Sequence, residues 1–323
     1  MLRPKVIFNI TTEEPFTPLD CGFTQANKPA NILENPAQIM IREWIAEYKP
    51  ANTDQANQAL REIMQDIALA GLSRGGFFKE AAFYGGTALR IFHGLDRFSE
   101  DLDFSLLKTM PDFSLEPYFP AIEEEFGSLG LNISIREKKK TLVNNIDSAF
   151  LKAETVWREL VLEGTIPQNG LDQKPAITIK LEVDRKPAPG FETEERLLLK
   201  PVSFYVKCFT LPDLFAGKMH ALLFRKWGTN VKGRDWYDME WYIRKGISMN
   251  LKHFTLRAID SGDWKQKNFT QAEFMQLLKE RINAVDLQIA RKDITRFIKD
   301  PKRLNIWSPK YFLDLVKQLK FLP

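Results

Sequence analysis

The stretch Phe83–Leu107, which reads FYGGTALRIFHGLDRFSEDLDFSLL, constrains the fold more than any other part of this sequence. A short apolar run leads into a Gly-Gly-Thr turn, a helix-length segment follows, and an Asp-Leu-Asp triplet opens a second apolar run. Because residues two apart on a strand lie on the same face, Asp101 and Asp103 would share one face while Leu102 and Phe104 take the other. We therefore expect strand, turn, helix and strand in this order.

The turn and the aspartate pair together indicate a phosphate site beside a metal site. Glycines at Gly85 and Gly86, with Thr87, let backbone N–H groups approach a phosphate at the start of a helix. Two neighbouring carboxylates repel each other, and a divalent cation such as Mg²⁺ or Mn²⁺ relieves that repulsion. Most Gly-Gly pairs are only turns and most DxD triplets lie on solvated loops, but the strand–turn–helix order favours a site for phosphoryl or nucleotidyl transfer.

This stretch resembles the nucleotidyltransferase toxins of the AbiEii/AbiGii abortive-infection family, whose pattern reads roughly GG[ST]xL…RxSxDxDF. Three further blocks match in the same order, AITIKLEVD, LPDLFAGKMHALLFR and GRDWYDMEWY, so that the resemblance runs from about residue 60 to about 245. It implies membership of the polymerase-beta-like nucleotidyltransferase superfamily and metal-dependent transfer of NMP from an NTP to an acceptor hydroxyl. It also implies a toxin with a cognate antitoxin, and some relatives modify the 3′ end of tRNA.

A third carboxylate is expected on the strand AITIKLEVD, where alternation puts Thr178, Lys180, Glu182 and Asp184 on one face. Any antiparallel strand with one wet face would show the same pattern. Two-metal nucleotidyl transfer commonly uses three carboxylates from adjacent strands, and the resemblance places the third here. We favour Glu182 over Asp184 because it lies deeper in the apolar run.

Lys218 falls in the middle of the apolar stripe of a helix that we expect to start at Leu211, with Thr210 as its cap. A lysine there must extend to solvent along the helix, pair with a carboxylate, or meet an anion such as a nucleotide phosphate. The resemblance places the family's functional lysine in this helix. Arg225 continues the same face, and we count it with Arg90 among the candidates for binding the nucleotide.

Asp235 and Asp238, three apart in GRDWYDMEWY, would be neighbours on one face of a helix, where unpaired like charges are unfavourable. A basic partner is therefore expected, and Lys218, Arg225 or Arg234 could supply it. The resemblance makes this block the family's fourth motif, in which an aspartate assists catalysis or holds the lysine. Which of the two aspartates does more stays open, and a buried structural ion pair at Asp235 is an equal alternative.

The composition of the 323 residues excludes several classes of protein. Two cysteines and three histidines without a CxxC pattern make a disulfide framework or a zinc site improbable and suit a cytoplasmic protein. No apolar run approaches the roughly 18 residues that cross a membrane. The net charge is only +4, but RKDITRFIKDPKR (291–303) holds six basic and two acidic residues and REKKK (136–140) is another basic run. Such clusters are usually solvated surfaces, and they are also compatible with an RNA acceptor.

The order of patterns predicts an α+β protein, with a small mixed sheet flanked by helices and then an all-helical C-terminal domain. We expect an extended arm over 1–36 with one short strand at KVIFNI, a nucleotidyltransferase domain over 37–205, and helices over 206–323. Within the middle domain, Thr53 or Asp54 would cap a second helix, LNISIRE and NIDSAFLKAE read as strands, and 164–175 and 186–201 read as long loops.

Two rival functions remain at the level of sequence. The nucleotide could be transferred to a protein hydroxyl rather than to RNA, because acceptor choice lies in surfaces that the motifs do not cover. Alternatively, the chain could be a non-catalytic binding module that keeps the fold. Against that second rival, Asp101, Asp103 and Glu182 are all present. The preferred NTP is not encoded in the motifs.

Overall fold

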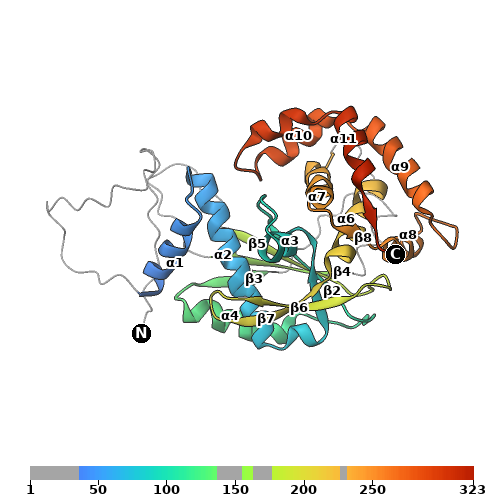
Figure 1. Ribbon diagram of the computed structural model, residues 1–323. Helices are drawn as coiled ribbons and strands as arrows, with labels where there is room; N and C mark the ends of the chain where they lie inside the picture. The colour runs from blue at the N-terminus through green and yellow to red at the C-terminus, as the bar shows by residue number, and fades with distance from the viewer. Residues whose placement is uncertain (1–35, 137–154, 163–176, 226–230) are drawn as a thin grey trace. The chain divides into compact units, whose positions relative to one another are not determined.

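The computed structural model describes residues 36–136, 155–162, 177–225 and 231–323 (Figure 1). These residues divide into two compact units, and neither unit is one continuous stretch of chain. Unit 1 takes the described parts of residues 1–79, 112–182 and 197–205, and unit 2 takes the described parts of 80–111, 183–196 and 206–323. The predicted arm lies outside the described residues, except that Pro36 begins helix α1. The predicted domain boundaries stay a prediction.

The helices of unit 1 follow the helical spacing of apolar residues in the sequence. They are α1 (Pro36–Glu47), α2 (Thr53–Arg74) and α4 (Phe119–Ser128), with 3₁₀ turns η1 (Phe77–Lys79) and η2 (Glu116–Tyr118). Asn52 caps α2, because its side chain accepts a hydrogen bond of 2.9 Å from Gln55 N. The predicted cap at Thr53 or Asp54 was therefore wrong by one or two residues.

Two strands of unit 1 pair with each other. β3 (Ile133–Arg136) confirms the strand predicted at LNISIRE, and it runs antiparallel to β4 (Thr155–Leu162). The strand predicted at NIDSAFLKAE lies wholly outside the described residues, as does the loop predicted over 164–175. β5 (Thr178–Asp184) crosses from unit 1 into unit 2 after Glu182, and its side chains alternate between half-buried and buried as the sequence predicted.

The sheet around β1 is mixed, and its register positions the aspartate pair. β1 (Ala81–Tyr84) runs antiparallel to β2 (Asp101–Leu106), with Tyr84 directly opposite Asp103. On its other side β1 runs parallel to β7 (Phe204–Phe209), whose outer neighbour is β6 (Thr193–Leu198). Because Asp103 pairs with the last residue of β1, it lies at the point where the chain turns into helix α3 (Gly85–His93).

Two of these strands were missed by the sequence analysis. The predicted loop 186–201 is wrong, since it contains β6, and β7 was not predicted at all. The side chains of β6 alternate only between exposed and half-buried positions, and Glu194, Glu195 and Arg196 fall among them. An edge strand of this kind lacks the apolar face from which a strand is recognised.

The remaining elements of unit 2 are mainly helices, as the sequence predicted. They are α6 (Leu211–Phe224), α7 (Gly233–Arg244), α8 (Leu251–Asp260), α9 (Gln271–Ala284), α10 (Leu287–Thr295) and α11 (Pro309–Leu315), with 3₁₀ turns η3 (Pro301–Ile306) and η4 (Val316–Gln318). The two-residue strands β8 (Ser248–Met249) and β9 (Lys320–Phe321) are the exception. In Figure 1, α7 lies inside an arc formed by α10, α11 and α9.

The α+β class predicted from the sequence is thus confirmed, with a mixed sheet, flanking helices and a helical C-terminal region. The core of that region is aromatic. Phe215 of α6 stacks on Tyr242 of α7 with ring centroids 4.2 Å apart, and both side chains are fully buried. Among the helices in the described ranges, none combines the length and the apolar character that a membrane span requires.

Candidate functional site

The Gly-Gly-Thr turn holds the aspartate pair through close contacts that only small residues permit. Gly85 has φ +83°, and a Cβ at this position would lie 2.4 Å from Asp103 Oδ2. Position 85 therefore requires glycine for two reasons: the left-handed backbone and the close approach of the Asp103 carboxylate. The buried Thr87 donates a hydrogen bond from Oγ1 to the backbone oxygen of Asp101. The turn thus fixes the backbone of one aspartate and contacts the carboxylate of the other.

Gly86 serves a different contact. A Cβ there would lie 2.6 Å from Arg97 Nη2 and 3.1 Å from Ser99 Oγ. The turn therefore contacts several positions of the segment 97–103: Gly85 meets Asp103, Gly86 meets Arg97 and Ser99, and Thr87 meets Asp101. The turn also begins α3, and the N-cap residue Tyr84 makes no side-chain capping hydrogen bond. The first N–H groups of α3 are consequently not capped by that side chain, which suits an anion at this helix end.

Asp101 and Asp103 lie on the half-buried face of β2, while Leu102 and Phe104 are buried on the other face, as the alternation predicted. Within the described ranges, no group of three or more His, Cys, Asp or Glu side chains is placed to hold a metal ion together. Two adjacent carboxylates nevertheless suit Mg²⁺, which commonly takes one or two carboxylates and completes its shell with substrate phosphates and water. The residues present fit a cation that arrives with a nucleotide.

Lys218 of α6 pairs with both aspartates of α7. Its Nζ lies 3.1 Å from Asp235 Oδ1 and 2.9 Å from Asp238 Oδ2, and its side chain is only 15% exposed. Of the three outcomes expected for a lysine in an apolar stripe, the structure therefore shows pairing with carboxylates. Arg225, directly after α6, adds a second ion pair to Asp235 at 2.7 Å. Asp235 and Asp238 share one face of α7, as their spacing predicted.

Arg97 is a member of this cluster that sequence reasoning missed. Its Nε and Nη2 donate to the two carboxylate oxygens of Asp238, both at 2.6 Å, and Nη1 donates to Phe98 O at 2.9 Å. The Arg97 side chain is 2% exposed and that of Asp238 is 0% exposed. The arginine of the RxSxDxDF pattern was a signal, but its partner lies 141 residues further along the chain.

Burial and pairing oppose each other in setting the charges of this cluster. Burial alone would raise the pKa of the Asp238 carboxyl, but the positive charges of Arg97 and Lys218 outweigh it and hold that pKa below its usual value. Burial would likewise lower the pKa of Arg97, whereas Asp238 raises it. Both groups are therefore ionised. In the described part of the chain, the ion pairs of Arg97, Lys218 and Arg225 are all with Asp235 or Asp238, so these five side chains sum to one positive charge.

Four predicted residues have other neighbours. Glu182 lies in unit 1 and forms an ion pair with Lys180 on the same face of β5. Asp184 accepts a hydrogen bond of 3.0 Å from Lys186 N, and the choice between these two carboxylates as third metal ligand stays a prediction. Arg90 Nη1 donates to Leu95 O at 3.0 Å, which ties the end of α3 to the following loop. Arg234, a candidate partner for Asp235, lies 3.6 Å from Glu100 instead.

Comparisons with known proteins identify one matching family and two similar solved structures. The sequence model of the family described as "Nucleotidyl transferase AbiEii toxin, Type IV TA system" matches residues 67–314, which include the turn, the aspartate pair and the ion-pair cluster. A solved structure of a Helicobacter pylori protein proposed to be a nucleotidyltransferase is 18% identical with a TM-score of 0.45, over 79% of this chain and 90% of that one. The structure of JHP933 from Helicobacter pylori is 18% identical with a TM-score of 0.44, over 79% and 88%. No curated protein gives a significant match.

Proposed function

Because the chain belongs to the AbiEii family of nucleotidyltransferase toxins from toxin–antitoxin systems, we propose that it transfers NMP from an NTP to an acceptor hydroxyl on RNA. The acceptor oxygen would form a bond to the α-phosphorus while the bond from that phosphorus to the bridging oxygen of the β-phosphate breaks. The hydroxyl proton would pass to water and pyrophosphate would leave. The single observation that supports this reaction most is that the Gly-Gly-Thr turn contacts both aspartates. Gly85 lies against the Asp103 carboxylate, and Thr87 donates a hydrogen bond to the backbone oxygen of Asp101.

One group of residues would bind the phosphates of the nucleotide, and another would bind the metal ion. The N–H groups of Gly85, Gly86 and Thr87 would receive the β- and γ-phosphates at the start of α3. Asp101 and Asp103, with Glu182 as the favoured third carboxylate, would hold Mg²⁺ or Mn²⁺. That cation would neutralise the triphosphate and lower the pKa of the acceptor hydroxyl.

The ion-pair cluster would act on the leaving group. Its net positive charge, with Lys218 held between two carboxylates, favours the binding of one more anion. We assign Lys218 the role of balancing the charge that develops on pyrophosphate, and Arg225 a role in binding the nucleotide. Asp235 and Asp238 would hold the lysine in place rather than contact the substrate. A cognate antitoxin is the proposed protein partner, and the cytoplasm the proposed place of action.

The reaction can be tested with α-labelled NTPs, total tRNA and Mg²⁺. We expect the wild-type chain to transfer label to tRNA and Asp101→Ala/Asp103→Ala to transfer none. The matched control is Asp112→Ala/Asp260→Ala, which removes two exposed carboxylates from other parts of the chain and should transfer label normally. Omitting Mg²⁺ and Mn²⁺ should abolish transfer by the wild type.

Each rival function predicts a different result in the same assay. Label that migrates with protein instead of tRNA would make a protein hydroxyl the acceptor. Absence of both transfer and NTP binding would leave only the non-catalytic binding module. Separate Glu182→Gln and Asp184→Asn variants identify the third carboxylate, since only loss of the true ligand should raise the Mg²⁺ concentration needed for half-maximal transfer.

A further inference from the structure

The basic run 291–303 is joined to the segment that immediately precedes the aspartate pair. Phe98 N donates to Phe297 O at 2.8 Å, and Arg97 forms an isolated antiparallel bridge with Ile298. Phe297 and Ile298 are buried, whereas Lys292, Arg296 and Lys299 are exposed. The apolar residues of this run therefore fix it against the site, and its cations face solvent.

Two arginines at this junction share a single carboxylate. The guanidinium groups of Arg234 and Arg296 both lie over the ring of Phe297, with their Cζ atoms 4.4 and 4.6 Å from its centroid. Glu100 Oε2 lies 3.6 Å from Arg234 and 3.8 Å from Arg296, which is longer than a hydrogen bond. Each guanidinium carries five N–H donors. The pair is thus held in place, carries excess positive charge and retains donors for an anion.

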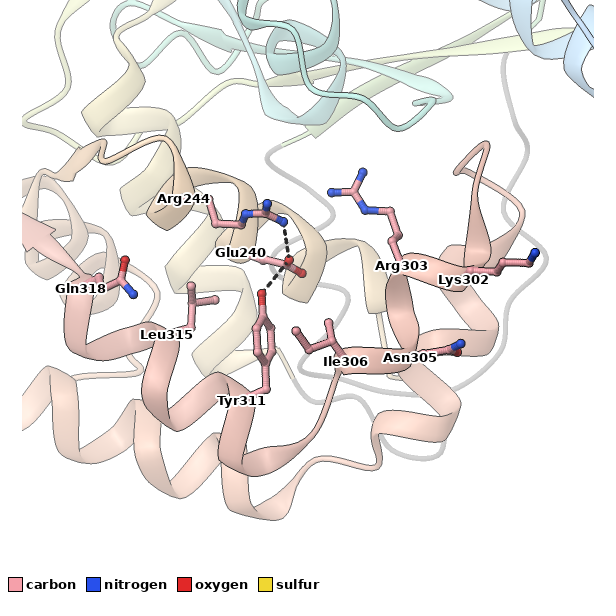
Figure 2. A pocket seen from close by; sticks show the side chains of 9 residues that line it. All are labelled: Glu240, Arg244, Lys302, Arg303, Asn305, Ile306, Tyr311, Leu315 and Gln318. Carbon is pink, nitrogen blue, oxygen red and sulfur yellow. Dashed lines mark hydrogen bonds and ion pairs between the residues drawn. The ribbon is translucent and has the colours of Figure 1, made fainter.

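Two further cations, Lys302 and Arg303 of η3, line a cavity of about 830 Å³ (Figure 2). Arg303 pairs with Asp96 and lies over the ring of Tyr237, 4.9 Å from its centroid, and Lys302 is exposed beside it. Arg244 of α7 also lines the cavity.

Glu240 is the one acidic residue among those that line the cavity. It accepts hydrogen bonds from Trp307 Nε1 at 2.7 Å, Tyr311 Oη at 2.8 Å and Arg244 Nη1 at 3.2 Å. Its charge is therefore already compensated, and Lys302 and Arg303 of η3 add two further cations to the lining of the cavity.

We propose that these side chains, Arg234, Arg296, Lys302, Arg303 and Arg244, form a cationic ridge that binds the phosphodiester backbone of the RNA acceptor. This inference rests on the proposed function and extends it by locating the acceptor. Arginines of the ridge pair with Glu100 and Asp96, which lie one and five residues before Asp101. At most about 18 Å of extended chain therefore separates these two carboxylates from the aspartate pair. Several cations, of which Arg234, Arg296 and Arg303 are held over aromatic rings, match a polyanion of regularly repeated charge.

Fluorescence anisotropy of a labelled single-stranded RNA of mixed sequence, added to the full chain without NTP, tests the ridge. The variant Arg296→Gln/Lys302→Gln removes two exposed cations of the ridge, and Lys265→Gln/Lys279→Gln removes two exposed lysines elsewhere as the matched control. At about 0.1 M salt we expect the ridge variant to bind on the order of tenfold more weakly, with the slope of log K against log salt reduced by about 1.4. The control should match the wild type.

Equal RNA affinity in the ridge variant and the control would overturn the ridge, even if NMP transfer to RNA is observed. Failure of the wild type to bind RNA would overturn it as well, and transfer of NMP to protein would then preserve the enzyme with another acceptor. Tighter binding of a poly-glutamate peptide than of RNA, lost in the ridge variant, would assign the surface to an acidic protein and overturn the RNA assignment. NTP affinity, measured alongside, should be the same in all three proteins.

Discussion

At the scale of single residues, the site depends on one buried arginine. Arg97 connects Gly86 in the turn to Asp238 in the ion-pair cluster, and both charged side chains are almost fully removed from solvent. Asp238 and Lys218 could be selected from the sequence because each lies in a motif of its own. Arg97 also lies in a motif, RxSxDxDF, but its role could not be predicted, because nothing near position 97 indicates that its carboxylate partner is 141 residues away.

Arg97→Ala should therefore destabilise the protein strongly. It leaves the Asp238 carboxylate buried with Lys218 as its remaining ion-pair partner in the described chain, and breaking a buried pair typically costs about 3–5 kcal/mol. Arg97→Lys keeps the charge but loses the two parallel hydrogen bonds, so its effect should be intermediate. Urea denaturation monitored by tryptophan fluorescence measures both. Lys317→Ala, which removes one exposed ion pair, should leave the midpoint unchanged, and an equally small shift for Arg97→Ala would refute the argument.

Gly85→Ala should separate the effect on the site from the effect on the backbone. Gly85 and Gly94 both have positive φ, +83° and +74°, but only at Gly85 would a Cβ meet Asp103, whereas nothing lies within 4 Å at Gly94. Both alanine variants should lose about 1–2 kcal/mol from left-handed strain. Only Gly85→Ala should also lose NMP transfer, because the Asp103 carboxylate must move. Transfer lost to the same degree in Gly94→Ala would contradict this explanation.

At the scale of elements, helix α7 packs closely against α10 at a glycine. A Cβ on Gly233, the first residue of α7, would lie 1.8 Å from Ala290 O in α10. The contact matters for the site, because α7 carries Asp235 and Asp238 and α10 leads into the cationic ridge.

Gly233→Ala should consequently force α10 away from α7 and lower the free energy of unfolding by about 1–3 kcal/mol or more. Gly217→Ala in α6 is the matched control, because open space surrounds that position. There, alanine should raise stability by about 0.5–1 kcal/mol, the usual advantage of alanine over glycine within a helix. The thermal midpoints of the two variants should thus move in opposite directions.

The last turn of α3 makes stability depend on pH. Burial, with a smaller contribution from the charge of Arg196, lowers the pKa of His93 from about 6.5 to about 4. Between about pH 4 and pH 6.5, His93 therefore binds a proton in the unfolded chain but not in the folded chain. The free energy of unfolding should consequently fall as pH decreases from about 6.5 to about 4. His93→Gln should reduce this slope in denaturation curves collected across that range. An unchanged slope would show that His93 is accessible to protons.

At the scale of the whole molecule, the two units are interleaved along the chain. Unit 2 draws on three separate stretches, and contacts join its first stretch to its last, including Arg97 to Asp238 and Phe98 to Phe297. The sequence indicated the elements of this unit from local patterns such as AAFY and DLDFSLL. It could not indicate β6, whose exposed edge needs no apolar alternation, or the pairing of segments far apart in the chain.

A fragment of residues 206–323 should therefore not fold on its own, although it contains every helix from α6 onward. It would retain Asp238 and Lys218 but lack Arg97. We expect helical signal without a cooperative thermal transition by circular dichroism, in contrast to the full chain under the same conditions. A sharp transition in the fragment would show that the helical region is an autonomous domain.

The contact between Gly86 and Arg97 also has an evolutionary consequence. Any side chain at position 86 would displace the guanidinium, and any shorter residue at position 97 would leave the Asp238 carboxylate without its main partner. We therefore expect joint selection on the three positions, since a change at one should be harmful until the others change as well. Among relatives that share this site, substitutions at 86, 97 and 238 should appear together in the same lineages.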